Sequence, residues 1–384
     1  MSVFDKLKEL GITEYKVLTV EDIEAINLGS SILATGGGGD PEIGYLWVKS
    51  IFARGKDFVL VDPSQIPDDA KVCTTGCLGS PLVLTEKPLA DMTLVNGVRA
   101  LADYLGGEMD AIIPVECGGI NSLLAYGVAA MMDLPCIDGD GMNRAFPRAD
   151  QTSWAINDVP ATPASSADNG GQITILDTKG DNAMMEDIAR KVSMAYGGIS
   201  WFTDYPMSGK TMKEHSVINS QAIAWEVGKA ALRSRAQHLR PIREIKKALK
   251  EVRGVDCFDV FEGKVVDINR DFGSEATKGF TMGTLTLEGI NDYKGQTATI
   301  NFQNEWLILK INGEVRCLPP DLIALLDTDT GEPIRSDIVK YGYRGTIILI
   351  PAHERMRTPR GFEQFGPRAF GYDSDFVPVE ELNR

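Results

Sequence analysis

The clearest pattern of apolar and polar positions lies in the first half of the chain. The apolar run AIIPV at 111–115 is rich in β-branched residues and predicts a strand covered on both faces. Gly118-Gly119 permits a tight turn, and Asn121-Ser122 supply capping side chains for a helix that continues to 133. A second strand at 134–137 is followed by the polar turn DGDGMN. In a parallel βαβ unit both polar turns leave the carboxyl ends of strands, so we expect them at one edge of the sheet, where α/β proteins bind ligands.

Similar strand and helix patterns precede this unit. Apolar runs at 58–61 and 72–75 predict strands. The patterns at 17–33 and 86–105 predict helices, with Pro88 near the start of the second one. The repeated βα order predicts a mostly parallel α/β N-terminal domain.

The pattern changes in the last third of the chain. Short apolar segments with Gly, Asn and Asp turns predict strands at 260–268, 280–287, 297–301, 306–311, 314–318 and 346–350. Asn312-Gly313 is a strong hairpin signal. A stretch rich in Pro, Ser, Asp and Gly at 150–171 indicates a boundary or a long loop. We therefore predict an α/β domain over 1–168 and a mixed, β-rich domain over 169–384.

The second predicted domain also contains helical patterns. We expect a strand at 172–176, a helix at 182–196 and a mostly helical segment at 210–249 that breaks at Pro241. The last segment, 352–384, carries scattered aromatics and predicts an extended wrap over the body.

Four consecutive glycines stand at 36–39, and ordered glycines cost backbone entropy, so the run needs a reason. One interpretation is a close approach of peptide N–H groups at Gly37 and Gly38 to an anion or polar ligand, with a helix starting at Pro41. The other is a helix C-cap followed by a flexible turn. The run matches neither GxGxxG nor GxxxxGK[ST], so we expect no nucleotide cofactor.

The charge balance is 39 basic against 54 acidic residues, a net charge of −15. This argues against nucleic acid and anionic membrane as partners, because both attract a basic surface. The six cysteines include no CxxC pair and indicate reduced thiols in a cytoplasmic protein. Charged residues at 5–9 interrupt any signal-peptide core, and no apolar run approaches a membrane span of ~20 residues. The three histidines form no HExxH zinc motif.

Thiols and carboxylates gather in the glycine-bearing turns after the predicted strands. We predict five catalytic residues there, namely Cys77, Glu116, Cys117, Asp138 and Asp140. A structural interpretation stands beside this one. Free cysteines often fill cores, and Asp-Gly-Asp-Gly is also a plain turn whose carboxylates accept backbone N–H groups.

Substrate-binding residues are predicted around the same turns and in an aromatic segment further along. They are Gly37, Gly38, Gly118, Gly119, Asn143, Arg144, Trp201 and Asp204. Arg144 would clamp a substrate carboxylate or neutralise the nearby aspartates. Trp201 and its aromatic neighbours would line a pocket for a flat ligand, although such aromatics also fill cores.

Five separated motifs resemble the DUF917 family, described as S-methyl thiohydantoin desulfurase-like and associated with hydantoinase/oxoprolinase systems. They are ATGGGGDP (34–41), TGCLGSP (75–81), ECGG (116–119), CIDGDGMNRAFP (136–147) and WFTDYPMSG (201–209). The resemblance covers nearly the whole chain. It implies an α/β N-terminal domain, a β-containing C-terminal domain and a role in degrading hydantoin-type or related cyclic amides.

Two mechanisms fit water addition at a ring carbon with release of a thiol. In one, Glu116, Asp138 and Asp140 hold a divalent metal, zinc for preference, that generates hydroxide. In the other, Cys77 or Cys117 attacks as a thiolate while a carboxylate moves protons. The site would lie at the carboxyl edge of the N-terminal sheet, closed by a 197–209 loop from the second domain.

We therefore expect a hydrolase that acts on a small hydantoin-like ring and forms a homo-oligomer. The competing hypothesis is a non-catalytic subunit or ligand-binding component of a hydantoinase or oxoprolinase partner. A third is a racemase-like use of Cys77 and Cys117 on opposite faces of a ring, which requires both sulfurs to face one cleft.

Overall fold

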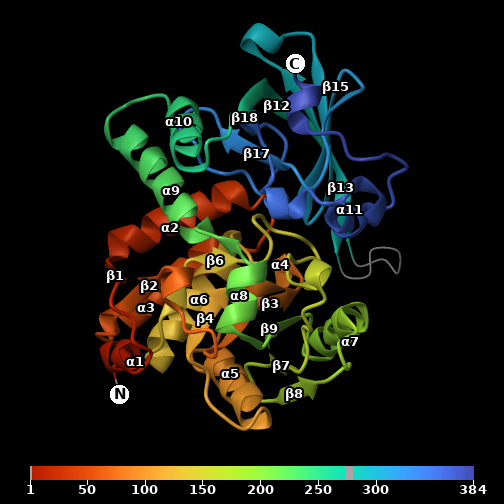
Figure 1. The fold of residues 1–384 in the computed structure, drawn as a ribbon. Helices are drawn as coiled ribbons and strands as arrows, with labels where there is room; N and C mark the ends of the chain where they lie inside the picture. The colour runs from red at the N-terminus through yellow and green to blue at the C-terminus, as the bar shows by residue number, and fades with distance from the viewer. Residues whose placement is uncertain (1, 88, 273–279) are drawn as a thin grey trace. The chain divides into compact units, whose positions relative to one another are not determined.

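The computed structural model describes residues 2–87, 89–272 and 280–384 (Figure 1). The chain forms two compact units, and each combines segments that are distant in sequence. The first unit comprises Met1–Glu24, Gly39–Met142 and Arg148–Ala222; the second comprises Ala25–Gly38, Asn143–Pro147 and Ile223–Arg384. The predicted boundary after residue 168 divides the chain linearly and stays a prediction.

The first unit contains an α/β sheet with its helices. Its strands are β1 (Lys16–Leu18), β2 (Phe58–Val61), β3 (Lys71–Gly79), β4 (Ala111–Pro114), β5 (Cys136–Ile137), β6 (Gly139–Asp140), β7 (Ala164–Ala167), β8 (Ile173–Leu176), β9 (Ile199–Thr203), β10 (Met207–Ser208) and β11 (Val217–Ile218). Its helices are α1 (Val3–Glu9), α3 (Pro41–Ala53), α4 (Pro81–Glu86), α5 (Thr93–Tyr104), α6 (Gly119–Met132), α7 (Asn182–Ala195) and α8 (Gly209–His215). The unit boundaries fall within two further helices, α2 (Val20–Leu33) and α9 (Ser220–Ala236).

Within the described residues, the main sheet has the strand order β1-β2-β5-β4-β3-β9-β7-β8, and β10 pairs with β3. Strands β2, β5, β4 and β3 are parallel. On the far side of β3, strands β9, β7 and β8 continue the sheet in antiparallel order. Every residue of β2 and β4 is buried, as expected for apolar strands covered on both faces. The predicted α/β architecture is confirmed.

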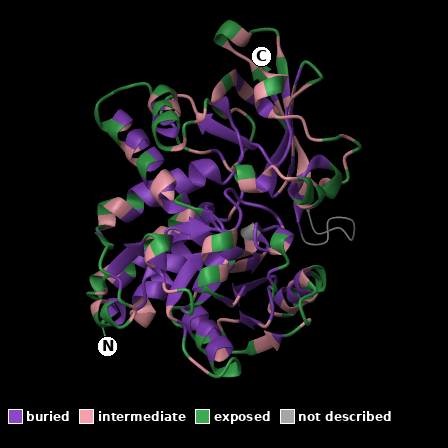
Figure 2. Ribbon diagram, in the orientation of Figure 1, coloured by how far each residue is buried: buried purple, intermediate pink, exposed green. Residues whose placement is uncertain are grey.

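Helices cover both faces of this sheet. Helix α6 is buried from Gly119 to Ala130, which explains its apolar, Ala-rich composition (Figure 2). A Cβ at Gly97 of α5 would lie 3.2 Å from Ser165 Oγ and 3.7 Å from Thr203 Oγ1. Asp204 directly follows Thr203, and the charge of Glu186 on α7 contributes to raising the pKa of Asp204. Because neighbouring strand residues point to opposite faces, α5 and α7 cover opposite sides of β9.

Two strands lie where the sequence pattern predicts loops. Ala-Ser-Ser-Ala forms β7 inside the stretch 150–171, and the aromatic segment forms β9. Strand β9 pairs with β3 on one side and β7 on the other. The predicted 197–209 lid from a second domain is therefore wrong, because 199–203 is a paired strand of the first unit. Small residues of low strand propensity fit there since α5 packs closely over them.

Two further predictions, one for a helix and one for the C-terminal segment, need correction, and a third is refined. The helix predicted over 86–105 is α5, which starts at Thr93; Pro88 lies outside the described residues. The segment 210–249 is mostly helical with a break before Pro241, as predicted. It comprises α8, α9 and α10 (Pro241–Arg253), and β11 separates α8 from α9 because it pairs with β6. The C-terminal segment is not simply extended, since it forms α11 (Pro359–Phe365) and α12 (Val379–Leu382).

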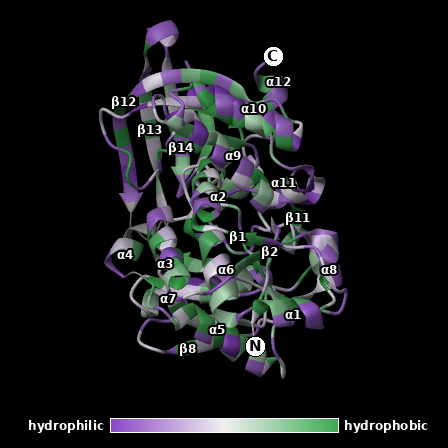
Figure 3. Cartoon of the chain, turned by 90° about the vertical axis from the view of Figure 1, so that its left-hand side faces the viewer, coloured by the Kyte–Doolittle hydropathy of each residue, from purple (hydrophilic) through white to green (hydrophobic). Residues whose placement is uncertain are grey.

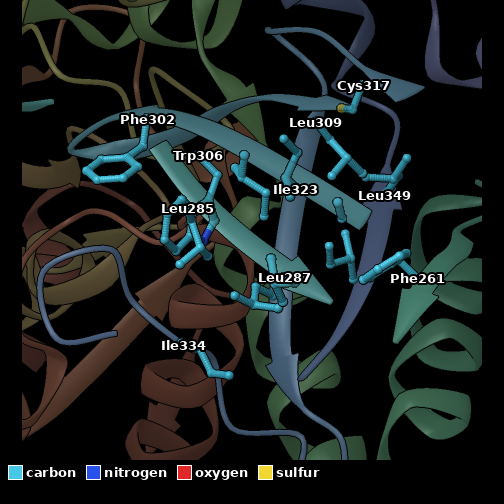
Figure 4. Close-up of a cluster of buried hydrophobic side chains, with 14 of the residues drawn as sticks. Phe261, Leu285, Leu287, Phe302, Trp306, Leu309, Cys317, Ile323, Ile334 and Leu349 are labelled. Atoms are coloured by element: carbon cyan, nitrogen blue, oxygen red, sulfur yellow. The ribbon is translucent and has the colours of Figure 1, made fainter. Parts of the chain in front are cut away.

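The second unit is built on an antiparallel sheet. Its strands are β12 (Phe258–Phe272), β13 (Thr281–Gly289), β14 (Thr297–Gln303), β15 (Glu305–Ile311), β16 (Glu314–Cys317), β17 (Leu322–Asp327) and β18 (Arg344–Ile350). In the described ranges, their order is β16-β15-β14-β13-β12-β18-β17. Figure 4 shows part of its core, in which Leu285, Trp306 and Ile323 converge with other buried side chains. The β-rich second half and the Asn312-Gly313 hairpin, with both residues at positive φ, are confirmed.

Helix α10 shows how the helices of this unit are patterned. Hydrophilic and hydrophobic residues alternate along it (Figure 3), and its buried positions are Pro241, Ile245, Ala248 and Leu249, at helical spacing. Across the described part of the chain, no helix is both long and apolar enough to span a membrane.

Two helices of the second unit touch at backbone distance. A Cβ on Gly29 of α2 would lie 1.7 Å from the carbonyl oxygen of Ala224 on α9. A Cβ on Gly228 would lie 1.8 Å from the carbonyl oxygen of Ala25. On each helix, the glycine lies four residues after the alanine whose carbonyl oxygen faces the glycine of the other helix. The two contacts are therefore reciprocal. Only hydrogen fits at both positions.

We expect Gly29→Ala to destabilise the protein by about 1–3 kcal/mol, because the added methyl group overlaps backbone atoms of the neighbouring helix. In an open helix the same change would stabilise by ~1 kcal/mol, so the sign is diagnostic. The measurement is the denaturant midpoint in urea. Glu24→Ala, on an exposed position of the same helix, is the control and should change stability by less than about 0.5 kcal/mol. An unchanged or raised midpoint for Gly29→Ala would contradict this packing.

Candidate functional site

The carboxyl ends of three neighbouring parallel strands carry the main predicted site residues of the first unit. Glu116 follows β4 and Asp138 follows β5. Cys77 lies in the part of β3 beyond its pairing with β4, which ends at the pair Thr75 and Pro114. The predicted meeting of these turns at one sheet edge therefore holds in the structure.

Asn121 joins Cys77 to Glu116. The peptide N–H of Cys77 donates to Asn121 Oδ1 at 2.9 Å, and Asn121 Nδ2 donates to Glu116 Oε1 at 2.6 Å. Both Glu116 and Asn121 are buried. The sequence interpretation assigned a capping role to Asn121 and Ser122. In the structure the N-cap residue of α6 is Gly118, and Ser122 Oγ donates to the carbonyl oxygen of Glu116.

Cys77 is a partly exposed residue, and its thiol lies near a negative charge. Desolvation of the thiol and, second, the Glu116 carboxylate raise the pKa of Cys77 to about 12. Both effects disfavour the thiolate. At neutral pH, Cys77 is therefore a neutral thiol next to a carboxylate.

Cys117 has a structural environment. Its thiol is completely buried and donates to the carbonyl oxygen of Ser220 at 3.4 Å. Burial, followed by the charges of Asp140, Asp138 and Glu116, raises the pKa of Cys117 well above its ordinary value. A buried thiol engaged in this way does not share a cleft with Cys77, so the geometry does not support two thiols acting on opposite faces of a ring.

The two aspartates hold backbone. Asp140 Oδ2 accepts from the peptide N–H groups of Cys117 at 2.7 Å and Met142 at 3.1 Å. Asp138 Oδ1 accepts from those of Gln221 at 2.9 Å and Ala222 at 3.1 Å, in the first turn of α9. Burial raises the pKa of Asp138 to about 6, although these hydrogen bonds oppose the rise. Negative charge at a helix N-terminus is favourable, which accounts for Asp138 at this place.

The three carboxylates do not fit a shared metal ion. Among the residues that the structure describes, no group of three or more His, Cys, Asp or Glu side chains is arranged to hold one. Glu116 is bonded to Asn121, whereas Asp138 and Asp140 accept from different stretches of backbone.

The predicted glycines Gly118 and Gly119 shape the start of α6. Gly118 has the extended backbone of an N-cap residue, and Gly119 has a φ of 50°, which favours glycine. They let the chain turn directly from Cys117 into the helix that carries Asn121.

Four of the predicted substrate-binding residues lie in the second unit. The N–H of Gly38 donates to Glu305 Oε1 at 3.4 Å, and a Cβ on Gly37 would lie 2.0 Å from the same atom. The glycine run thus meets a carboxylate, as one interpretation required, but the carboxylate belongs to the protein itself. This explains the glycines without an external ligand.

Arg144 and Asn143 are bonded to backbone in the second unit. The Arg144 guanidinium is buried and donates to the carbonyl oxygens of Asp321 at 2.8 Å and Trp306 at 2.9 Å. Asn143 Oδ1 accepts from the peptide N–H of His353 at 2.7 Å. These contacts anchor both side chains to the backbone of the second unit, and the substrate-binding roles of Asn143 and Arg144 stay predictions.

Comparison with known families decides the relationship that the motifs suggested. Residues 21–178 match the N-terminal domain of the S-Me-THD-like family, and residues 180–379 match its C-terminal domain. The chain belongs to the S-Me-THD-like family. The resemblance read from the five motifs is thereby confirmed.

Further comparisons place the S-Me-THD-like chain by fold. It is similar to the X-ray crystal structure of a protein from Chromobacterium violaceum, with a TM-score of 0.80 and 18% sequence identity over 95% of this chain and 100% of the other. At this identity the likeness shows the fold alone. A search among curated proteins gave no significant match.

Trp201 and Asp204 of the S-Me-THD-like chain lie on opposite faces of the sheet around β9. Trp201 is buried and pairs with Cys77 of the adjacent strand β3, and its Nε1 donates to Asn169 Oδ1 at 2.8 Å. Asp204 is buried, and its Oδ1 accepts from Thr74 Oγ1. Its Oδ2 has no hydrogen-bond partner among the described residues. Burial raises the pKa of Asp204 to about 7, with the Thr74 hydrogen bond opposing the rise and Glu186 adding to it.

Two residues of this network escaped the sequence interpretation. Asn121 resembles a capping residue in sequence, and Thr74 is an ordinary strand residue. The signal available for Asn121 was its place in the third position of a helix, one turn after a predicted catalytic Glu. Thr74 had no such signal, because its partner Asp204 lies 130 positions away.

Asp204 should make stability depend on pH in a defined direction. Its pKa in the folded protein, about 7, is above the ~3.9 of an unfolded aspartate, so the folded state binds the extra proton between these values. Stability therefore falls as the pH rises from about 4 to 7. Asp204→Asn removes this term, so the free energy of unfolding of the variant should rise relative to the parent by on the order of a few kcal/mol over that range.

The measurement is urea unfolding of both proteins at several pH values between 4 and 8. Asp138, with a pKa raised to about 6, contributes a trend of the same sign in both proteins and cancels in the difference. A difference between variant and parent that does not change with pH would contradict the environment assigned to Asp204.

Proposed function

We propose that this chain is a hydrolase that adds water to a ring carbon of a small S-methyl thiohydantoin-type ring and releases a thiol. Membership of the S-Me-THD-like family supports the substrate class. The observation that carries the proposal is the pair formed by Glu116 and Cys77, joined through Asn121 at the carboxyl edge of a parallel sheet. Such edges are where α/β proteins place their chemistry.

In this proposal Glu116 is the general base. Water attacks the ring carbon that bears the sulfur substituent while the Glu116 carboxylate accepts a proton from it. The new C–O bond forms, and the C–S bond breaks as the tetrahedral intermediate collapses. One hydrogen of the water ends on the ring nitrogen and the other on the released thiol, so the reaction needs neither oxidant nor reductant.

The environment of Cys77 favours this route over attack by a standing thiolate. The raised pKa of the Cys77 thiol, about 12, leaves very little thiolate at neutral pH. A neutral thiol beside the base is a hydrogen-bond donor and a contact surface for a flat ring, next to the buried indole of Trp201. Cys77 then assists binding, and its sulfur forms no covalent intermediate.

The remaining predicted catalytic residues act through the backbone in this scheme. Asp140 fixes the turn at Cys117 and Asp138 holds the first turn of α9. Their loss would disturb the fold of the edge before it affected a proton transfer. The competing hypothesis is a ligand-binding or assembly subunit of a hydantoinase or oxoprolinase system. Such a subunit does not need Glu116 as a base, so substitution of Glu116 distinguishes the two hypotheses.

We expect Glu116→Gln to reduce turnover of an S-methyl thiohydantoin by roughly 10²–10⁴-fold with the fold retained, because the amide cannot accept the proton. Thiol release is followed with a thiol-reactive dye and ring conversion by mass spectrometry. Glu14→Gln, at an exposed position of the same unit, is the matched control and should keep full activity.

Cys77→Ala distinguishes the two chemical routes. With water as nucleophile the variant keeps measurable turnover with a raised KM, whereas an obligatory thiolate would leave none. Cys257→Ala, at the other partly exposed thiol, is its control. Full activity in Glu116→Gln would refute the base. No turnover by the parent protein on any thiohydantoin or hydantoin ring would favour the subunit hypothesis.

A further inference from the structure

Strand β3 extends beyond its parallel neighbour β4. The two pair as far as Thr75 and Pro114, and β3 continues to Gly79. On the other side, β9 pairs with β3 from Gly76 to Gly79. The N–H of Thr74 points to that side, because it donates to the carbonyl oxygen of Asp204. Since successive N–H groups alternate between edges, the N–H of Cys77 points to the edge that β4 has left.

Asn121 occupies that edge. Its side-chain oxygen accepts the Cys77 N–H as a neighbouring strand would, and its side-chain nitrogen is thereby directed to Glu116. A primary amide can accept from a peptide N–H through its oxygen and donate to a carboxylate through its nitrogen at the same time. Placement near the start of the buried helix α6, with Asn121 itself buried, fixes both contacts.

We propose that Asn121 is a positioning residue for the hydrolysis: it holds the Glu116 carboxylate at a fixed place beside Cys77, using the unpaired edge of β3 as its anchor. This inference rests on the proposed function for its catalytic meaning. The geometry it asserts, a Glu116 charge near the Cys77 sulfur that accepts a hydrogen bond from the Asn121 amide, can be tested without any substrate.

The thiol of Cys77 reports on that charge. Within the described part of the chain, the Glu116 carboxylate raises the pKa of this thiol, and a carboxylate released from Asn121 would disfavour the thiolate less. Asn121→Ala removes the donor, so the thiol pKa should fall. Asn121→Asp keeps an acceptor for the Cys77 N–H but adds a second carboxylate, so the thiol pKa should rise once both acids are ionised.

The experiment measures alkylation of Cys77 by iodoacetamide between pH 8 and 11, followed by intact-mass spectrometry. A Cys257→Ser parent leaves Cys77 as the partly exposed thiol, because Cys73, Cys117, Cys136 and Cys317 are buried. Each fall of one unit in thiol pKa speeds alkylation at fixed pH by roughly three- to fourfold, since the gain in thiolate is offset in part by lower nucleophilicity.

We expect Asn121→Ala to be alkylated at least about threefold faster than the parent at pH 9 and Asn121→Asp to be alkylated more slowly at pH 10. In a Glu116→Gln parent, Asn121→Ala should have little further effect, because the charge that it positions is gone. A purely structural role for Asn121 would loosen the edge in both variants and speed alkylation in both. That result, an unchanged rate, or an Asn121→Ala effect of full size without Glu116, would overturn the proposal.

Turnover separates this inference from the proposed function. If the parent hydrolyses an S-methyl thiohydantoin, Asn121→Asp should shift the acid limb of its pH–rate profile upward by at least about one unit, because two adjacent carboxylates share a proton. An unmoved limb in an active variant would overturn the positioning role. A parent without turnover would refute the proposed hydrolase, while the alkylation rates would still decide whether Asn121 holds the Glu116 charge.

Discussion

A buried peptide N–H must find an acceptor, and this requirement organises the candidate site. Strand β3 extends past β4, so the N–H of Cys77 has no strand beside it. The helix that follows β4 supplies the acceptor through Asn121, and the same amide then bonds Glu116. A thiol, a carboxylate and the start of α6 are brought together by completing one strand edge. The chemistry proposed for this edge is thus a by-product of how the sheet satisfies its own backbone.

Close backbone contact is the second constraint, and it explains the glycines better than ligand binding does. Gly29 and Gly228 let α2 and α9 pack so closely that a Cβ at either position would overlap a carbonyl oxygen of the other helix. Gly37 and Gly38 lie against the Glu305 carboxylate. In both places a side chain would occupy space already filled by the protein, so the glycines are needed for packing. Flexibility is not required to account for either.

Local patterns predicted much of this architecture, and non-local pairing accounts for most of what they missed. The apolar run at 111–115, the helix after it and the next strand form a βαβ unit as expected, because their apolar composition predicts that they are buried. Strand β7 is Ala-Ser-Ser-Ala, which has no strand signature, and it exists because β9 pairs with it. Cys77 and Glu116 were identifiable from their glycine-flanked turns. Asn121 carried only a weak local signal, because its partner Cys77 lies 44 positions earlier. The carbonyl partners of Arg144 could not be predicted, because its charge does not reveal them.

The discontinuous second unit has a consequence for how the chain is made. Helix α2 leaves the ribosome early, but the glycine surface of Gly29 is completed by Gly228, about 200 residues later, which at ~5–20 residues per second is a delay of roughly 10–40 s. Until then the face of α2 around Gly29 is not covered by α9. The glycine run at 36–39 likewise lacks its contact with Glu305. During synthesis, the segment Ala25–Gly38 therefore emerges long before most of the second unit into which it packs. A fragment ending near residue 178 would contain this segment without those packing partners.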